Sequence, residues 1–200
     1  MATTTAPKQR SETAEQILDL AETLIQTRGY SAFSYQDIAD GLGIRKASIH
    51  YHFASKADLG IAVVNRYIDR FDAALSEIAG NESKSSMAML DFYVQPYLQF
   101  ADTPDRVCLS GALAGEMLAL PPELRQRVDH FFQTHQAWLT KILKRGVGRG
   151  EFVLPAPATK TARLFFAALQ GALLVKRTTD DPSQLGDVIS VMKLQLAARR

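Results

Sequence analysis

The chain of 200 residues lacks most of the features that mark secreted, disulfide-bonded and membrane proteins. Its one cysteine, Cys108, excludes an intrachain disulfide and a zinc site built from several cysteines. No apolar run approaches the roughly 18 to 20 residues that a membrane-spanning helix needs, and the start MATTTAPKQR has no apolar core of a signal peptide. These absences predict a cytoplasmic protein with no membrane partner.

Excess charge is also nearly absent. The 23 Lys and Arg residues exceed the 21 Asp and Glu residues by only 2, and a net charge of +2 is too small to indicate a class of partner. The basic residues Arg45, Lys46 and Lys56 nevertheless share segment 41–57, which contains no acidic residue. Such a local concentration of positive charge fits a nucleic-acid-binding surface, and it also fits an ordinary solvated helix face.

Apolar residues recur at helical spacing along most of the chain, and no segment shows a convincing strand alternation with hairpin chemistry. The pattern predicts an all-α fold of about nine helices. They are expected near residues 14–28, 34–42, 45–53, 56–80, 86–100, 108–118, 122–145, 158–176 and 182–198. Thr13 and Gln16 predict a capping box at the first helix, and Pro96 predicts a kink in the fifth.

The spacing within residues 34–53 is that of a helix-turn-helix. Ala39 is small where the two helices cross, Gly43 tolerates the tight backbone of the turn, and Ile49 locks the second helix onto the first. Three further apolar residues supply the surrounding core, namely Ile38, Leu42 and Ile44. An ordinary helical hairpin is the alternative, but the basic and aromatic surface of the second helix favours a DNA-binding motif.

Further motif residues lie on both sides of this segment. The first helix ends in Arg28-Gly29-Tyr30, Ser34 precedes the second helix, and the third ends in the aromatic run 51–53 followed by Ser55 and Lys56. On these residues the first third of the chain resembles the DNA-binding domain of the TetR/AcrR family of transcriptional regulators. The remainder is similar to that family in helical layout and length. The resemblance implies an N-terminal tail at 1–10, a helix-turn-helix domain at 11–55, and a ligand-binding and dimerisation domain at 56–200.

The resemblance implies that the helix-turn-helix domain, called the head below, binds a double-stranded DNA operator. The recognition helix is the predicted helix at 45–53, and its N-terminal half would approach base edges in the major groove. Ser34, at the N-cap of the preceding helix, and Lys56, at the start of the long helix 56–80, would contact phosphates. The predicted DNA-binding residues are Ser34, Tyr35, Arg45, Lys46, Ser48, His50, Tyr51, His52 and Lys56. Ala47 and His50 depart from the glycine and the aromatic residue that family members often have there.

His50 and His52 also raise the question of a metal site. Residues two apart on a helix diverge by about 200°, so their imidazoles point to nearly opposite faces. Zinc would need further His, Cys or carboxylate ligands that this short helix does not offer. We therefore expect no metal and no cofactor. One of the two histidines could instead pack against the domain core, and this alternative stays open.

The resemblance further implies that the second domain forms a homodimer. The last two predicted helices carry stripes of small and apolar residues that suit a four-helix interface with a two-fold mate. The predicted interface comprises Leu164, Phe165, Ala168, Gly171, Ala172, Val175, Leu185, Val188, Ile189, Met192 and Leu196. Taken alone, each stripe is more typical of intrachain core, and only the resemblance favours an interface.

A pocket for an unknown small-molecule effector is the other implied feature. Aromatic rings with a few polar tips suit an apolar ligand held by one or two hydrogen bonds. The predicted pocket residues are Phe92, Tyr93, Tyr97, Phe100, Cys108, Glu116, Met117, Phe131, His135 and Trp138. Ordinary core packing is the alternative for each ring, and Glu116, the odd charge in an apolar run, either orients a ligand or is solvated.

Cys108 allows two interpretations. It lies near the start of its predicted helix and close to Arg106, an environment that favours a thiolate. The segment VCLSGALAGE is similar to the Cys-Leu step of electrophile-responsive family members, which implies a sensor cysteine. A small buried hydrophobic residue is the other interpretation.

These observations predict a ligand-responsive transcriptional regulator, a repressor, that binds a palindromic operator as a homodimer and is released by a small apolar or electrophilic effector. One alternative is a thiol-based enzyme with Cys108 as nucleophile, but the sequence has no nucleophile elbow, glycine-rich phosphate loop or paired metal-ligand motif. The other is a constitutive architectural DNA-binding protein, which has little need of an aromatic pocket.

Overall fold

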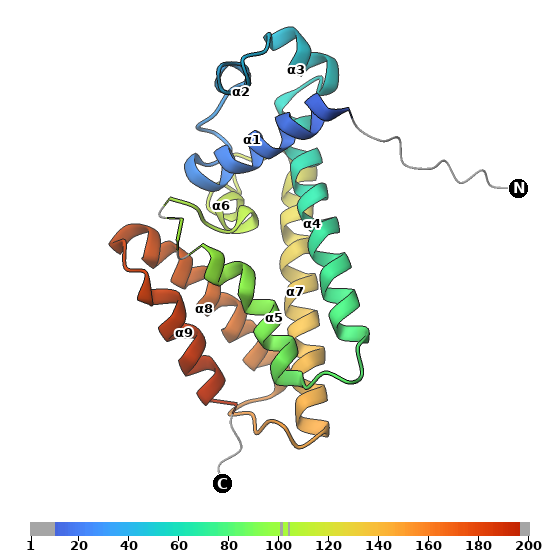
Figure 1. Cartoon of the computed structure of the whole chain (residues 1–200), viewed down its shortest axis with the longest axis vertical. Helices are drawn as coiled ribbons and strands as arrows, with labels where there is room; N and C mark the ends of the chain where they lie inside the picture. Colours follow the sequence, from blue (N-terminus) through green and yellow to red (C-terminus); the bar gives the residue numbers. More distant parts are fainter. Residues whose placement is uncertain (1–10, 101, 104, 197–200) are drawn as a thin grey trace, which may run out of the picture.

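The computed structural model describes residues 11–100, 102–103 and 105–196, and these form nine α-helices and no β-strand. The helices are α1 (Glu12–Arg28), α2 (Tyr35–Leu42), α3 (Lys46–His52), α4 (Lys56–Gly80), α5 (Ser86–Gln99), α6 (Leu109–Ala114), α7 (Pro122–Gly148), α8 (Ala158–Thr179) and α9 (Ser183–Leu194). Figure 1 shows α1, α2 and α3 as a head at one end, with α4 running from it beside α7 into the body. The all-α prediction is confirmed. No helix in this part of the chain is long and apolar enough to cross a membrane.

Local sequence signals set the ends of the head helices. Ser11 caps α1, because its side-chain oxygen accepts a hydrogen bond from the Ala14 backbone N–H at 3.3 Å. The predicted capping box of Thr13 and Gln16 is therefore wrong, since the helix begins earlier. Between α2 and α3, Gly43 has φ +65°, a left-handed conformation that glycine adopts without a Cβ penalty. The predicted helix-turn-helix turn is thus confirmed.

Two body helices end earlier than the sequence predicted. α6 stops at Ala114, because residues 115–119 form turns in which the Ala119 N–H donates to the Glu116 carbonyl at 2.8 Å. α9 stops at Leu194, and residues 197 and 198 of its predicted range lie outside the described residues. α5 continues through Pro96, so this proline does not terminate it.

α4 joins head and body through one continuous core. Its buried side chains face α1 of the head and α7 of the body, and they are Leu59, Val63, Val64, Tyr67, Ile68, Leu75 and Ile78. Gly60 permits the close approach, because a Cβ there would lie 2.9 Å from Tyr30 Cε2 and 3.2 Å from Leu124 Cδ2. Each fully buried side chain of this kind stabilises the fold by about 1.5–3 kcal/mol. The head is thereby fixed to the body along the first turns of α4.

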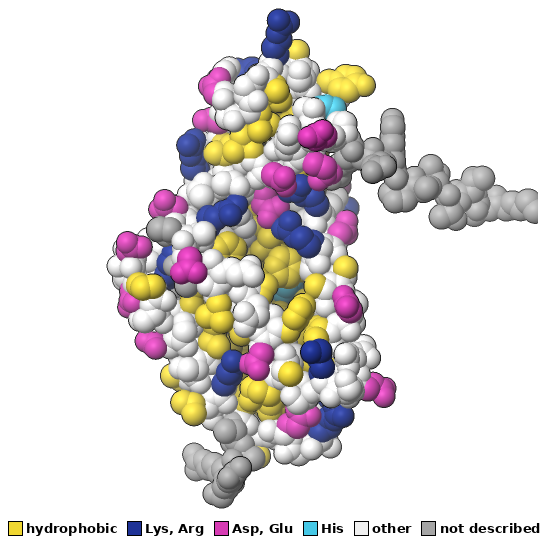
Figure 2. Space-filling view, in the orientation of Figure 1, with side chains coloured by type: hydrophobic (Ala, Val, Ile, Leu, Met, Phe, Trp, Pro, Cys, Tyr) yellow, Lys and Arg dark blue, Asp and Glu magenta, His cyan; other side chains and the backbone are white. Residues whose placement is uncertain are grey.

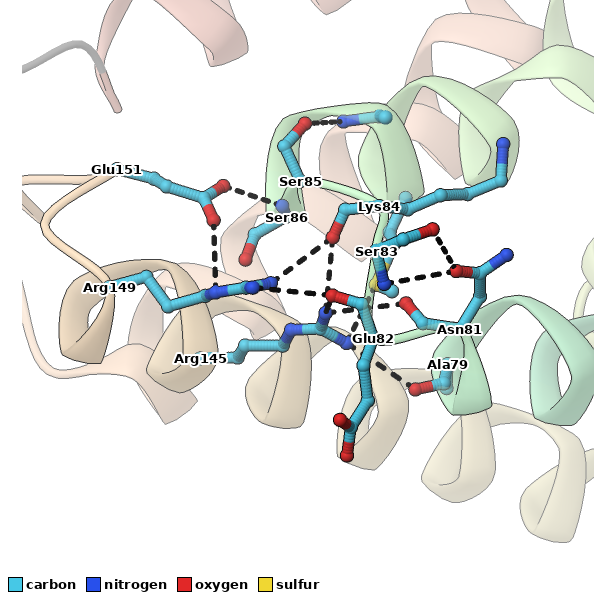
Figure 3. A network of polar contacts seen from close by, with 12 residues as sticks. Ala79, Asn81, Glu82, Ser83, Lys84, Ser85, Ser86, Arg145, Arg149 and Glu151 are labelled. Atoms are coloured by element: carbon cyan, nitrogen blue, oxygen red, sulfur yellow. Dashed lines mark hydrogen bonds and ion pairs between the residues drawn. The ribbon is translucent and has the colours of Figure 1, made fainter.

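Arg145 of α7 and Arg149, which directly follows α7, hold the end of α4 and the loop that leads to α5 (Figure 3). Arg145 donates to the carbonyl oxygens of residues 79, 81, 82 and 84 at 3.0–3.4 Å. Arg149 adds hydrogen bonds of 3.2 Å to the carbonyls of Glu82 and Lys84. A helix ends with carbonyls that lack intrahelical partners and with a partial negative charge, so two guanidinium groups suit this position.

Arg145→Met should lower the free energy of unfolding by about 1–3 kcal/mol, because it removes the charged donor from four carbonyls. Denaturant unfolding followed by circular dichroism measures the change. Lys141→Met, on the exposed side of the same helix, is the matched control and should shift stability by less than about 0.5 kcal/mol. Equal stability of the two variants would contradict this role of Arg145.

Candidate nucleic-acid interface and ligand clefts

α3 presents a basic and aromatic surface at the tip of the head. Ile49 is fully buried on its inner side, whereas Arg45 and Lys46 are exposed. Ser48 is half-buried beside them, and Tyr51 is 85% exposed. Figure 2 shows a Lys or Arg side chain projecting from this tip. Exposed positive charge beside an exposed ring is an arrangement that can contact both phosphates and base edges.

The start of α2 is occupied by its own capping box. The Asp37 carboxylate accepts hydrogen bonds from the Ser34 backbone N–H at 2.8 Å and from the Ser34 hydroxyl at 2.7 Å. The Ser34 hydroxyl oxygen in turn accepts from the Gln36 N–H at 3.2 Å. The hydrogen bonds from Ser34, together with Arg28 at 3.3 Å, lower the pKa of the Asp37 carboxyl. The Ser34 N–H and hydroxyl are thus already hydrogen-bonded to a carboxylate at this helix start, and the phosphate contact expected for Ser34 stays a prediction.

Of two residues predicted to contact DNA, Tyr35 is buried in the head and Lys56 is half-buried. The Tyr35 hydroxyl donates to the Phe53 carbonyl at 2.9 Å, and burial raises the pKa of Tyr35 to about 12. The Lys56 ammonium donates to the Phe33 carbonyl and sits 4.8 Å and 4.4 Å from the ring centres of Tyr30 and Phe33. Partial burial lowers the pKa of Lys56. Both side chains fix the loops that precede α2 and α4, so their contribution to the head is first of all structural.

The two histidines of α3 have different surroundings. His50 is exposed, its Nδ1 lies 3.3 Å from the Ala54 carbonyl oxygen, and its ring meets the edge of Tyr35 at 4.8 Å. His52 is half-buried against the Tyr51 ring at 5.1 Å. In the part of the chain that the structure describes, no group of three or more His, Cys, Asp or Glu residues is placed to hold a metal ion. His50 therefore lies at the rim of the head, between the Tyr35 ring and solvent.

Two of the clefts in the described part of the body have α1 in their walls. The α4–α5 cleft, of about 380 Å³, is lined by Glu22, Gln26, Tyr67, Arg70, Phe71, Ala74, Pro96, Gln99, Phe100, Thr103 and Arg106. The α6–α8 cleft, of about 650 Å³, is lined by Arg28, Gly29, Val107, Gly111, Ala112, Ala114, Gly115, Glu116, Phe132, Gln136, Phe166, Ala167, Gln170, Leu174 and Arg177. Both volumes lie in the range of small-molecule sites.

The structure brings only part of the predicted pocket together. Five predicted residues surround a small space of about 10 Å³ that shares lining residues with the α4–α5 cleft, namely Tyr97, Phe100, Cys108, Phe131 and His135. Trp138 is core instead, because its Nε1–H donates to the Leu75 carbonyl at 2.9 Å and its ring stacks on Tyr93 at 5.2 Å. Phe92 is 41% exposed, and Met117 packs half-buried against the core. Neither lines the clefts described above.

His135 lies at the inner end of the α4–α5 cleft and is 1% exposed. Its Nδ1 is 3.0 Å from the Tyr93 hydroxyl, and its Nε2 has no hydrogen-bond partner among the described residues. Burial lowers the pKa of His135 to about 3, so the imidazole is neutral at physiological pH. Cys108 is 3% exposed, with its Sγ 3.7 Å from the Tyr67 hydroxyl. This burial favours a packed cysteine over an accessible sensor thiol.

Glu116 links the body to the head. Its Oε2 accepts a hydrogen bond from the Ser31 backbone N–H at 2.9 Å, and a Cβ on Gly29 would lie 2.2 Å from its Oε1. Partial burial alone would raise the pKa of the Glu116 carboxyl, but the Ser31 hydrogen bond and the Lys56 charge lower it. On the same side, Arg177 Nη2 donates to the Thr27 carbonyl at 2.5 Å. Glu116 therefore lines the α6–α8 cleft and also holds the loop that follows α1, so it is neither merely solvated nor only a pocket residue.

The predicted dimer residues divide between surface and core. Six are buried in the core of the chain itself, which leaves them almost no surface for a partner: Phe165, Ala172, Leu185, Ile189, Met192 and Leu196. The others form a surface with three exposed apolar residues that the sequence reading missed, and this α8–α9 face comprises Leu164, Ala168, Gly171, Leu174, Val175, Val188, Val191 and Leu194. An exposed apolar surface of this extent is typical of a protein–protein interface.

Sequence reasoning also missed the charged residues of the α4–α5 cleft. Arg70 and Glu22 form an ion pair of 2.8 Å at its wall, and Arg66 bonds the same carboxylate at 3.1 Å. A signal was present, since the acids of α1 at 15, 19 and 22 lie on one helix face and the arginines of α4 lie four residues apart. Two complementary stripes of this kind indicate that α1 and α4 pack side by side.

Residues 17–63 match the family described as bacterial regulatory proteins, tetR family, and residues 87–192 match the tetracyclin repressor-like C-terminal domain. The chain belongs to the tetR family. The two matches cover the head with the start of α4, and α5 to α9. The recognition made from the head residues is confirmed, and this TetR-family chain is a DNA-binding transcriptional regulator.

Individual relatives agree with this assignment. The biofilm operon icaADBC negative transcriptional regulator IcaR of Staphylococcus aureus is 27% identical over 138 residues, which are 64% of this chain and 73% of IcaR. A TetR-family regulator from Agrobacterium tumefaciens is similar in structure, with a TM-score of 0.86, 35% identity and coverage of 92% of this chain and 97% of that chain. A TetR regulator from Legionella pneumophila gives a TM-score of 0.84 and 32% identity, over 94% of this chain and all of that chain.

Arg45→Ala should reduce the discrimination between a preferred operator and a scrambled duplex by about 5- to 150-fold, because an arginine that reads a base edge contributes roughly 1–3 kcal/mol of specificity. Fluorescence anisotropy with both duplexes at one fixed salt concentration measures this ratio. Lys141→Ala, far from the head on the exposed side of α7, should leave the ratio unchanged. Unaltered discrimination in Arg45→Ala would show that this residue does not read bases.

Proposed function

We propose that this TetR-family chain represses transcription by binding a palindromic operator as a homodimer, and that a small-molecule effector releases it. The observation that carries the proposal is the shared wall between head and clefts, since Glu22 and Gln26 of α1 line one cleft and Arg28 lines the other. A ligand that fills either cleft must therefore contact a helix of the DNA-binding head. Repression, rather than activation, is supported by the description of the relative IcaR as a negative regulator.

Selection of bound duplexes from a random pool at fixed salt tests the proposal as a whole. Two heads related by a two-fold axis should enrich a palindrome whose half-sites lie one DNA turn, or a multiple of it, apart. Absence of enrichment would favour the constitutive architectural protein. The thiol enzyme finds little support, because the Cys108 sulfur faces the Tyr67 hydroxyl while His135 Nδ1 faces Tyr93.

The homodimer part of the proposal rests on the α8–α9 face. Leu174 is 52% exposed, Val191 53% and Leu194 72%, and they lie beside small residues that allow close helix approach. A two-fold mate presenting the same face would bury this apolar surface in a four-helix arrangement. The same association would set the distance between the two recognition helices.

Val175→Arg/Val191→Arg should convert the dimer to a monomer, because each substitution occurs twice at a two-fold interface and places uncompensated positive charge in it. Light scattering coupled to size exclusion measures the mass. Val153→Arg, at another exposed apolar residue outside this face, is the control and should stay dimeric. A double variant with the mass of the wild-type protein would contradict the assigned interface.

The release step would pass through contacts between the body and the loop that follows α1. Glu116 holds the Ser31 amide and leaves no room for a side chain at Gly29, so a shift of the segment after α6 must move this loop or break the bond. An effector that prefers the shifted conformation lowers operator affinity by its differential affinity for the two states. Effector binding and operator release would thus be linked through the Glu116 carboxylate.

Glu116→Ala should lose the hydrogen-exchange protection of the Ser31 amide, because no carboxylate then accepts its hydrogen bond. In the wild-type protein the same protection should be present at neutral pH and fall on acidification below the ordinary carboxyl pKa of 4.5, since the pKa of Glu116 is lowered in the folded state. Glu123→Ala, an exposed acid of α7, is the control. Protection at Ser31 that survives in Glu116→Ala would rule out this link.

A further inference from the structure

An incompletely bonded arginine lines the α4–α5 cleft. Arg106 Nη2 donates to the Thr23 hydroxyl oxygen at 2.7 Å, but its Nε is buried without a hydrogen-bond partner among the described residues. Arg106 also has no ion pair with any carboxylate in the described part of the chain. A buried guanidinium N–H without an acceptor is costly, so the site favours a ligand that brings an acceptor oxygen.

The charges on the cleft wall leave a positive surplus. Its charged residues are Glu22, Arg70 and Arg106, and the Glu22 carboxylate is already shared between Arg70 at 2.8 Å and Arg66 at 3.1 Å. One carboxylate therefore faces two cleft arginines. Figure 2 shows Lys and Arg side chains, with Asp and Glu side chains among them, above a recess with hydrophobic walls on this face of the molecule. Two arginines beside a recess form an environment for a single anionic group.

Beside its charged residues and the polar side chains of Gln26, Gln99 and Thr103, the cleft has an apolar wall. Phe71, Pro96 and Phe100 line both the cleft and the small inner space, which leads to His135. His135 is 1% exposed, and its Nε2 lies there without a hydrogen-bond partner among the described residues. An apolar wall beside two arginines suits a ligand that joins a hydrocarbon body to one charged end.

We infer that the α4–α5 cleft binds an amphipathic carboxylic acid, whose carboxylate lies between Arg106 and Arg70 and whose aliphatic or aromatic body extends along Phe71 and Phe100 toward His135. The inference deepens the proposed function and rests on it only for the step from binding to operator release. Glu22 and Gln26 of α1 would lie beside the bound carboxylate, which places the head helix in direct contact with the ligand.

Calorimetric titration of the full chain without DNA tests the ligand class. Octanoate should bind about tenfold more tightly than octanamide, which has the same tail and no charge, and octylamine should bind more weakly still. Arg106→Met should abolish the preference for octanoate over octanamide, whereas Lys141→Met, on an exposed part of α7, should keep it. Equal affinities for octanoate and octanamide in the wild-type protein would overturn the inference.

Further variants separate charge, location and folding. Arg106→Lys retains the charge and should restore part of the preference, and Arg70→Met should reduce it even if Arg106→Met folds poorly. Arg177→Met, in the α6–α8 cleft, should keep the preference. A preference lost in Arg177→Met and retained in Arg106→Met and Arg70→Met would place the anion in the other cleft and overturn the assignment.

Operator release is measured separately, by anisotropy of a labelled operator titrated with the same three compounds. Octanoate that binds without releasing the operator would leave the ligand class standing and contradict its proposed regulatory role. Release by octanamide or octylamine, with no carboxylate preference in binding, would support the proposed function and overturn the inference. Release by octanoate that is lost in Arg106→Met would support both.

Discussion

The burial of α4 between α1 and α7 is the interaction on which the rest of the structure depends. α2 and α3 have eight and seven residues, too few to be stable alone in water, so they rely on packing against α1 through Ile38 and Ile49. α1 in turn rests on α4, whose Gly60 lets Tyr30 of the head and Leu124 of the body meet at the same place. The direction in which the recognition helix points is therefore set by a helix that also belongs to the body.

The same packing explains why the head and the clefts share residues. α1 presents acids to the arginines of α4, and Arg66 bonds Glu15 and Glu22 at 3.0 and 3.1 Å. The cleft opens where this polar seam meets the apolar core, and Arg106 and His135 each have a nitrogen without a hydrogen-bond partner in the described part of the chain. Buried polar groups are normally hydrogen-bonded, so unpaired ones at the wall of a cleft mark a place where a bound ligand can supply the missing hydrogen bonds.

The head was largely predictable because its signals are local. Gly43 at the turn, Ser34 at the cap and the spacing of Ile49 act within a few residues of their own position. The roles of Tyr35 and Lys56 were not, because their partners are the Phe53 and Phe33 carbonyls, 18 and 23 residues away. Only some residues of the α8–α9 face could be predicted, for a related reason. Helical periodicity defines stripes, but it does not tell which stripe faces the chain's own core and which faces outward.

The sequence by itself determined the helical class, the helix-turn-helix and the TetR resemblance, since each depends on residue type and short-range spacing. Only the tertiary structure decided which aromatic residues are core and which line a cleft. It also decided that Glu116 reaches Ser31, 85 residues away in the chain, and that Arg106 bonds Thr23 while its Nε has no partner among the described residues. These pairings join side chains from distant helices. Their geometry follows from how α1, α4 and α7 pack together, which no local pattern specifies.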